Sequence, residues 1–128
     1  AMERNTMKVA GFGFRSAATA DALLDALQTA GGPAGILLLA TAAGKTDAPA
    51  LRELATKLGL SIRAITPEAL TAAPVQYHSE RVEGLYGTGS VAEAAALCAA
   101  GAGARLVCPR VVSRDGMATA AIAEVASP

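Results

Sequence analysis

The sequence predicts an α/β protein: a three-layer α/β/α sandwich around a mainly parallel, mixed sheet of about five strands. Two patterns indicate this class. Short apolar runs typical of buried strands alternate with segments in which apolar residues recur at helical spacing, and glycine or proline separates them. Near the C-terminus, a turn signal between two apolar runs favours a hairpin, so the last strand is expected to run antiparallel.

The length of 128 residues suits one domain with a core of its own. Ala1 is expected to be a vector scar and residues 1–6 a flexible leader, which leaves residues 7–128 as the single domain. No internal repeat or low-complexity tail divides this domain further.

The first strand carries the motif on which the functional prediction depends. Met7 begins an apolar run that is expected to end in a Gly11-x-Gly13 turn, followed by Arg15. The glycines leave the backbone bare, and the N-terminus of the following helix favours an anion. A tight turn beside a solvated arginine is the plainer alternative. The pattern therefore predicts a basic, glycine-lined edge at the carboxyl end of this strand.

A helix, a strand and a second helix follow in order. The first helix begins at Thr19, shows leucines at helical spacing and ends at Gly31-Gly32-Pro33. The continuous apolar run from Gly35 to Ala40 is typical of a strand covered on both faces. The second helix tolerates Pro49 in its first turn and ends at Gly59.

A third strand and a short helix precede a long segment without a pattern. Leu60 to Ile65 is predicted to be the strand, and Thr66-Pro67-Glu68 opens a helix that runs to about Ala72. The segment from Ala73 to Gly89 has no clear period. Loops of this length are usually functional or mobile.

The last third of the chain closes the sheet. Ser90 and Glu93 are predicted to form a capping box at the start of an alanine-rich helix. Arg105 to Cys108 is predicted to be a fourth strand. A hairpin with its turn at Arg114-Asp115-Gly116 follows, and Pro109 breaks or borders it.

Composition excludes several kinds of partner. Eleven basic residues balance eleven acidic ones, so no overall field favours nucleic acid or an anionic membrane. Two Phe and two Tyr offer few stacking platforms for single-stranded nucleic acid. The longest strongly apolar run, residues 35–40, is too short to cross a bilayer, and no signal peptide is visible. We therefore expect a cytoplasmic protein with no nucleic-acid or membrane partner.

The cysteines and the histidine favour neither a metal site nor a redox pair. Cys98 falls on a predicted helix and Cys108 on a predicted strand, and buried, reduced thiols are favoured over a disulfide. His78, the one histidine, lies among polar residues of the long loop and is expected to be solvated. These residues predict no metal ligand set and no cofactor.

The carboxyl ends of the parallel strands gather the candidate binding residues, because ligands of open α/β sheets lie beyond these ends. Three segments should meet there: residues 11–16, 41–47 and 108–110. Gly44-Lys45-Thr46 is similar to the end of a phosphate loop, but Leu39 stands where that loop needs glycine. Ser16 likewise replaces the third glycine of a dinucleotide fingerprint. A nucleotide-binding α/β module is therefore the least favoured function.

Four stretches occur in a shared order and spacing: Gly11-Phe-Gly13-Phe-Arg15, Thr41 through Lys45 to Leu51, Gly89-Ser90-Val-Ala-Glu93 to Leu97, and Pro109-Arg110 followed by Thr119 to Ala123. Together they resemble the cobalamin-biosynthesis family of CobE and the C-terminal domain of CbiG, and they cover nearly the whole chain from Met7. A stand-alone domain of this length resembles CobE more than full CbiG, which carries further domains.

The resemblance implies a role in making the corrin ring of vitamin B12. The leading expectation is a carrier or accessory protein of the aerobic route that binds a precorrin or corrin intermediate, with other cobalamin-pathway enzymes as further partners. CbiG-type proteins open a precorrin lactone and release a two-carbon aldehyde, so a CbiG-like hydrolase is the first alternative. Whether the chain is an enzyme is left open, with binding favoured.

The resemblance also implies a set of ligand-binding residues. Arg15, Lys45 and Arg110 would pair with the peripheral carboxylates of the macrocycle. The other expected members are Gly11, Gly13, Thr41, Gly89, Ser90 and Glu93. The candidates for supporting the apolar face of the macrocycle are Phe12, Phe14, Tyr77 and Tyr86.

This chain departs from the family pattern at three positions. Phe14 stands where the family often has a cysteine, Ala48 where it has an acidic residue, and Arg110 where it has a lysine. Arg110 keeps the charge, but an arginine cannot serve as a base. Because the thiol and the carboxylate are missing, no catalytic residue is assigned.

Overall fold

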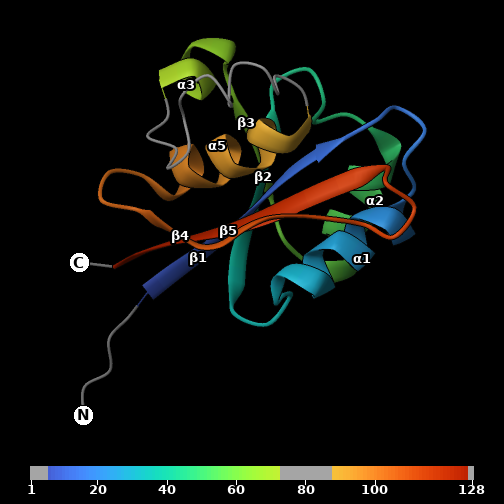
Figure 1. Cartoon of the computed structure of the whole chain (residues 1–128), viewed down its shortest axis with the longest axis horizontal. Helices are drawn as coiled ribbons and strands as arrows, with labels where there is room; N and C mark the ends of the chain where they lie inside the picture. Colours follow the sequence, from blue (N-terminus) through green and yellow to red (C-terminus); the bar gives the residue numbers. More distant parts are fainter. Residues whose placement is uncertain (1–5, 73–87, 127–128) are drawn as a thin grey trace.

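A computed structural model of the chain describes residues 6–72 and 88–126. The elements in chain order are β1 (Thr6–Phe14), α1 (Ala20–Ala30), β2 (Ile36–Ala42), α2 (Pro49–Leu58), β3 (Ile62–Ile65), α3 (Pro67–Ala72), α5 (Thr88–Ala100), β4 (Arg105–Val112) and β5 (Ala118–Ala126). The strands form one sheet in the order β3-β2-β1-β5-β4 (Figure 1). β1, β2 and β3 are parallel, and β5 runs antiparallel to both β1 and β4. The predicted mixed sheet is confirmed.

Helices cover both faces of the sheet, as Figure 1 shows, so the predicted three layers are confirmed. α1 and α2 pack on one face, where their leucines meet Phe12 of β1 in a buried cluster. α5 and α3 pack on the other face, where the alanines of α5 meet Val9. Side chains of a strand alternate between faces. The even positions of β1 therefore face α1 and α2, and the odd positions face α5.

Several predicted helix ends are confirmed by their capping contacts. The Thr19 hydroxyl accepts a hydrogen bond from the Ala22 N–H at 3.1 Å and begins α1. The Thr66 hydroxyl does the same for the Ala69 N–H of α3, also at 3.1 Å. Gly59 ends α2 in the left-handed conformation, with φ of 71°. These ends follow from local chemistry, which is why sequence alone located them.

The predicted Gly-x-Gly turn is wrong. Gly11 and Gly13 lie inside β1, both buried, and the chain turns only after Phe14. A Cβ atom at Gly11 would collide with the Ala92 carbonyl oxygen and would lie 2.6 Å from the Ala96 nitrogen. The missing side chain of Gly11 therefore lets the backbone of α5 rest directly on β1.

Three element boundaries also differ from the sequence prediction. β3 begins at Ile62 rather than Leu60, and α5 begins at Thr88, two residues before the predicted cap Ser90. The predicted fourth strand and the first arm of the hairpin are one strand, β4, whose register shifts around Pro109. A proline on an edge strand with a register shift is compatible with a continuous strand. No helix in the described ranges is long and apolar enough to cross a membrane.

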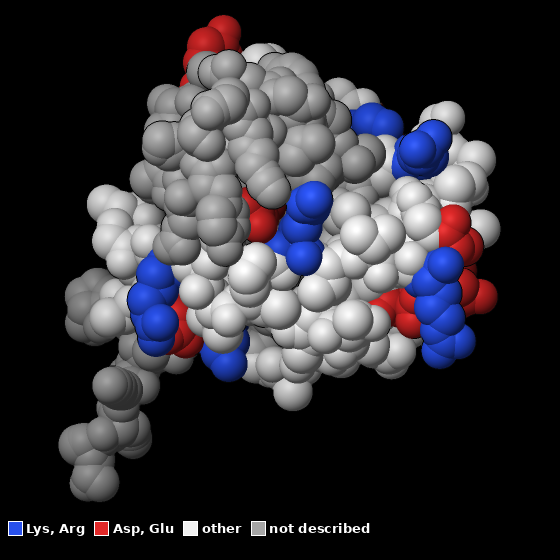
Figure 2. All heavy atoms as spheres, in the orientation of Figure 1, with Lys and Arg blue, Asp and Glu red and all other residues white. Residues whose placement is uncertain are grey.

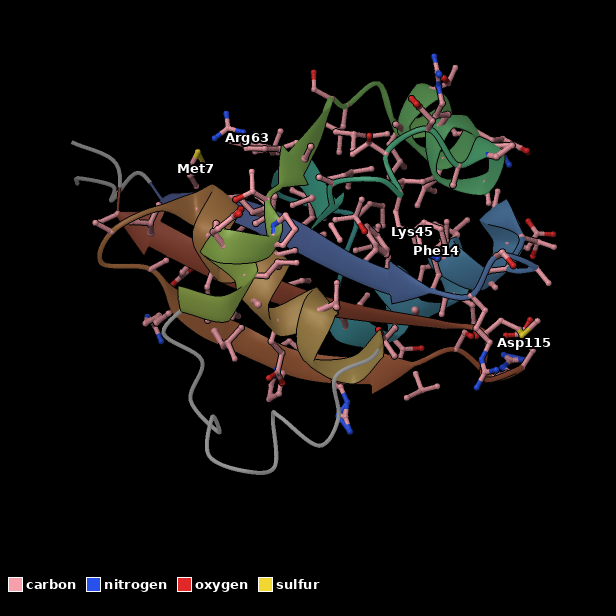
Figure 3. All side chains as sticks on the ribbon, turned by 90° about the horizontal axis from the view of Figure 1, so that it is seen from above. Met7, Phe14, Lys45, Arg63 and Asp115 are labelled. Atoms are coloured by element: carbon pink, nitrogen blue, oxygen red, sulfur yellow. The ribbon has the colours of Figure 1, made fainter. Side chains whose placement is uncertain are left out.

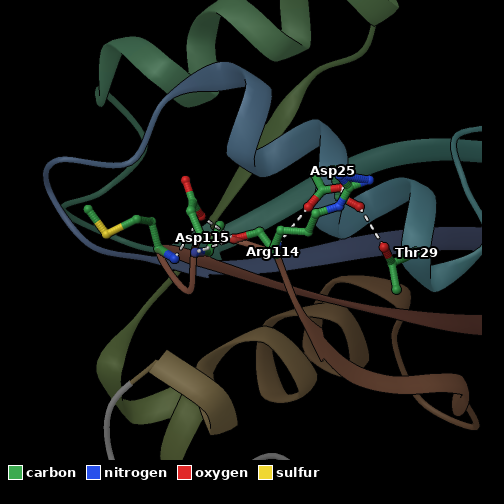
Figure 4. Close-up of polar contacts among 7 residues, drawn as sticks. Asp25, Thr29, Arg114 and Asp115 are labelled. Atoms are coloured by element: carbon green, nitrogen blue, oxygen red, sulfur yellow. Dashed lines mark hydrogen bonds and ion pairs between the residues drawn. The ribbon is translucent and has the colours of Figure 1, made fainter.

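The turn between β4 and β5 is held by polar contacts to itself and to α1 (Figure 4). The Asp115 carboxylate accepts hydrogen bonds from the Ser113 hydroxyl at 2.7 Å and the Met117 N–H at 3.0 Å. The Arg114 N–H donates to the Asp25 carboxylate of α1 at 2.7 Å, and the Arg114 side chain pairs with the same carboxylate at 3.9 Å. These contacts fix the hairpin predicted at Arg114-Asp115-Gly116.

Replacing Gly11 should destabilise the protein more than replacing a glycine with free space. We expect Gly11→Ala to lower the free energy of unfolding by about 2–3 kcal/mol, since the new methyl group meets rigid backbone of α5. Gly44→Ala is the matched control, because its Cβ would meet nothing within 4 Å and only its φ of 97° is strained. Its expected cost is about 1 kcal/mol. Urea unfolding measures both, and an equal loss would contradict the close packing of α5.

The turn should contribute stability in a pH-dependent way. The hydrogen bond from Ser113, followed by that from Met117, lowers the pKa of the Asp115 carboxyl below its ordinary value. Its contribution is therefore fully present above the unfolded pKa of about 3.9 and is lost as the pH falls through the lower folded pKa. We expect the stability difference between wild type and Asp115→Ala, measured by urea unfolding, to shrink as the pH falls from 7 to 2. A constant difference would contradict this.

Candidate functional site

The carboxyl ends of β1, β2, β3 and β4 lie on the same edge of the sheet, which we call the carboxyl edge. β4 belongs there because it is antiparallel to β5, which is itself antiparallel to β1. The C-terminus of α5 lies at the opposite edge, since it connects within a few residues to Arg105, which is level with Lys8 across β5. The N-terminus of α5 therefore reaches the carboxyl edge. This is the position of ligand sites in open α/β sheets.

Lys45 is held against the end of β1. Its Nζ donates a hydrogen bond to the Phe14 carbonyl oxygen at 3.0 Å and lies 5.0 Å from the centre of the Phe14 ring. Figure 3 shows the two side chains next to each other, at the far end of β1 from Met7. A cation over an aromatic ring is attracted to the ring face. The charge of Lys45 is thus fixed at the carboxyl edge, next to the backbone of Arg15, which follows Phe14 in the chain.

Polar side chains around β1 donate hydrogen bonds to carbonyl groups of β1 beyond the point where its pairing with β2 ends. The paired residues of β1 and β2 end at Gly11 and Ala40. Beyond that point the Phe12 carbonyl accepts from the Thr41 hydroxyl at 2.9 Å, and the Phe14 carbonyl accepts from Lys45. Because buried carbonyls need a donor, these contacts place Thr41 and Lys45.

Thr119 of β5, which the sequence analysis did not single out, contacts β1 on the side opposite to β2. The Thr119 hydroxyl, on β5, donates to the Gly13 carbonyl oxygen at 3.2 Å, and Thr119 is 6% exposed. The available signal was a single threonine within a run of alanines that is otherwise apolar. Thr41 on β2 and Thr119 on β5 thus hold the last residues of β1 from both neighbouring strands.

Glu93 and Arg110 meet away from Lys45. The Arg110 N–H donates to the Glu93 carboxylate at 3.0 Å. Val111 is level with Phe12 across β5, so Arg110 lies two to three residues, roughly 7–10 Å, short of the level of Phe14. The predicted cluster of three cations is therefore divided: Arg15 and Lys45 lie at the end of β1, and Arg110 lies further back along the edge strand β4.

Of the remaining predicted site residues, some are buried in the structure and others lie outside its described part. Gly11 and Gly13 are buried in the strand, so they do not form a bare turn around an anion. Gly89 and Ser90 lie in the first turn of α5, and the Ser90 side chain lies outside the described part. Glu93 accepts a hydrogen bond from the Arg110 N–H, and the predicted capping contact of Glu93 with the Ser90 side chain lies outside the described part. The prediction that Phe12 and Phe14 support the face of the macrocycle is wrong, since the two residues are 0% and 4% exposed. Tyr77, His78 and Tyr86 lie outside the described residues.

The charges on the surface are dispersed, and Figure 2 shows basic side chains spread over one face with acidic ones between them. Three ion pairs are described, Arg52–Asp47, Arg105–Glu124 and Arg114–Asp25. Within residues 6–72 and 88–126, no ion pair involves Arg15, Lys45 or Arg110. Their charges are therefore not neutralised by a described carboxylate side chain in contact with the charged group.

The two cysteines lie outside this arrangement. Both are free thiols and both are half-buried, Cys98 on α5 and Cys108 on β4. Burial raises the pKa of the Cys98 thiol, and its Sγ donates to the Ala69 carbonyl of α3 at 3.2 Å. A thiol with a raised pKa is a poor nucleophile at neutral pH. The sequence prediction of buried thiols is therefore met only in part, since both side chains keep some exposure.

Lys45 should contribute to stability because it satisfies a carbonyl group. We expect Lys45→Met, which keeps the length of the side chain, to lower the free energy of unfolding by about 1 kcal/mol, since the half-buried Phe14 carbonyl loses its donor. Lys57→Met, in the exposed last turn of α2, is the control and should change it by less than about 0.5 kcal/mol. Thermal and urea unfolding measure both variants. Equal effects would mean that the contact with Phe14 contributes nothing.

Comparison with known proteins identifies similar chains. The family model described as cobalamin synthesis G C-terminus matches residues 8–123. The crystal structure of cobalamin biosynthesis protein chiG from Agrobacterium tumefaciens str. C58 is 38% identical, with a TM-score of 0.69, over 95% of this chain and 100% of that one. CobE, a protein from the cobalamin (vitamin B12) biosynthetic pathway, is 30% identical, with a TM-score of 0.70, over 96% of this chain and 94% of that one. No curated protein matches this chain.

Proposed function

This chain belongs to the CbiG C-terminal family of cobalamin biosynthesis proteins, and on this premise we propose that its carboxyl edge binds a precorrin or corrin intermediate. In this role it acts as a carrier or accessory factor of the aerobic route. Such macrocycles are fringed with acetate and propionate side chains, which are anions at neutral pH. The observation that carries the proposal is the ammonium group of Lys45, fixed at the end of β1 beside Arg15.

The position of Lys45 suits recognition of a carboxylate. One N–H of its ammonium group is used by the Phe14 carbonyl, and two remain for a ligand. Because the side chain is already ordered, a ligand does not have to immobilise it on binding. Arg15 is exposed next to it, with its backbone fixed by a 3.0 Å hydrogen bond from its N–H to the Met117 carbonyl.

The N-terminus of α5 adds to the positive potential at this edge. The first N–H groups of a helix have no partner within the helix, and its N-terminus carries a partial positive charge, both of which favour anions. Two side-chain cations and a helix end together match a ligand with several carboxylates better than one with a single charge. This supports a polycarboxylate macrocycle as the ligand class.

Binding is favoured over lactone hydrolysis by the contacts of the described polar groups. Thr41 and Thr119 donate to carbonyls of β1, and Glu93 accepts from a backbone N–H. Phe14 stands at the position of the family's frequent cysteine and is buried. A hydrolase needs a nucleophile or bound water beside a base, and the described part of the edge brings no such pair together.

A nucleotide is a poorer candidate than a tetrapyrrole. Phosphate-binding loops present glycine backbone N–H groups to the ligand. Gly11 instead lies in a strand beneath α5, where the backbone of that helix occupies the space. Gly13 is buried in the same strand. Gly11 therefore serves helix packing, and neither glycine presents a backbone turn to a phosphate.

Titration with hydrogenobyrinic acid, a metal-free corrin with free carboxylates, tests the proposal. We expect a saturable shift in its visible absorbance with wild-type protein. Arg15→Ala combined with Lys45→Ala should weaken binding at least about 10-fold, or about 1.4 kcal/mol, because two charge-assisted contacts are lost. The charge-matched control is Lys57→Ala with Arg105→Ala, since both residues lie toward the opposite edge of the sheet. Unchanged affinity of the first variant would contradict the proposed site.

The same experiment separates a carrier from a hydrolase. A carrier leaves the mass of the ligand unchanged, whereas a CbiG-like hydrolase releases aldehyde from a lactone-containing precorrin at substoichiometric protein. We expect no turnover with the lactone substrate. Release of aldehyde in many equivalents would replace the carrier function with the enzymatic one. No binding of any corrinoid by wild-type protein would contradict both.

A further inference from the structure

The edge strand β4 shifts its register with β5 at two places, between Leu106 and Cys108 and between Cys108 and Val111. The second shift lies around Pro109 and Arg110. Pro109 has no N–H to donate. The Arg110 N–H, at this break, donates to the Glu93 carboxylate at 3.0 Å. A backbone group at an irregular point of the sheet is therefore bound by a side chain from the helix above it.

Glu93 is an unusual residue for its surroundings. It is 5% exposed in a stretch of α5 whose neighbours are buried alanines. A buried carboxylate is costly unless it is hydrogen-bonded, and its bond to an N–H is stronger than that of a neutral acceptor. The other buried residues of α5 are apolar, mostly alanines with Leu97. Glu93 supplies a polar connection between this helix and β4.

The hydrogen bond from Arg110 to Glu93 fixes the position of the Arg110 backbone. Glu93 is five residues after the first residue of α5, so it lies roughly 7–8 Å along the helix from the N-terminus. Arg110 itself is exposed and has no described ion pair. The contact thus holds the backbone of Arg110, whose side chain is exposed and cationic, near the N-terminal part of α5.

We propose that Glu93 is a positioning residue that acts through Arg110. Its carboxylate holds the Arg110 backbone so that the guanidinium group can reach a carboxylate of the ligand, and Glu93 does not touch the ligand itself. Burial of Glu93 and the like charge of a carboxylate ligand both oppose direct contact. The inference rests on the proposed function, because it assigns a second cation, set back from Lys45, to the same anionic ligand.

Two conservative variants separate the acceptor of Glu93 from its charge. Glu93→Gln keeps an oxygen acceptor at the same reach, whereas Glu93→Asp keeps the charge on a side chain one methylene shorter. In titrations with hydrogenobyrinic acid we expect Glu93→Gln to bind within about 2-fold of wild type. Glu93→Asp and Arg110→Ala should each weaken binding roughly 5- to 10-fold. The double variant that combines Glu93→Asp with Arg110→Ala should bind no more than about 2-fold more weakly than Arg110→Ala alone, because the two residues act as one unit.

The matched control is Glu124→Gln on β5, opposite the first residue of β4, where the carboxylate pairs with Arg105 at 2.7 Å and no binding role is assigned. It should leave affinity unchanged. If Glu93→Asp melts too early to be titrated, Glu93→Met takes its place, since it lacks an acceptor and suits a buried helix position.

Three outcomes would overturn the inference. The first is an effect of Glu93→Gln as large as that of Glu93→Asp, which would mean that the charge acts directly. The second is additive losses in the double variant. The third is normal binding by Arg110→Ala while the Arg15 and Lys45 variant binds weakly, which leaves the proposed function standing. Absence of binding by wild type instead contradicts the proposed function, and the inference with it.

Discussion

The arrangement of this protein depends on the close approach of α5 to β1 at Gly11. A side chain at this position would occupy the space of the helix backbone at Ala92 and Ala96. The approach explains why α5 is rich in alanine, because larger side chains would push the helix away from the sheet. It also sets the height of α5 above the sheet, and so the place of its N-terminus at the carboxyl edge and of Glu93 over β4.

The second constraint is the need of each β1 carbonyl for a donor. β1 extends beyond its pairing with β2, and side chains from neighbouring segments take over where the ladder ends. Thr41 and Lys45 supply those donors, and on the β5 side, where pairing continues to Phe14, Thr119 donates to the Gly13 carbonyl. A contact required for stability therefore also orders a cation at the place where ligands of α/β sheets bind. Structure and proposed function share one set of hydrogen bonds here.

Within residues 6–72 and 88–126, the proposed recognition uses the fringe of the macrocycle rather than its face. The rings of Phe12 and Phe14 belong to the core, so they cannot stack on a ligand. Charge is available through Arg15, Lys45 and Arg110, in a chain whose basic and acidic residues are equal in number. Local placement of a few cations, not an overall field, is what suits a ligand with carboxylates around its rim.

The fold class, the alternation of elements and the helix ends at Thr19, Gly59 and Thr66 could be predicted from the sequence, because apolar periodicity and capping are local properties. The placement of Arg15 and Lys45 at one edge could be predicted as well, since both follow parallel strands. The packing of Gly11 beneath a helix and the burial of Phe14 could not be predicted. The same holds for the position of Arg110, apart from Lys45 and bound to Glu93. Each of these depends on which segment lies opposite, and contacts between residues distant in the chain leave no mark in local pattern.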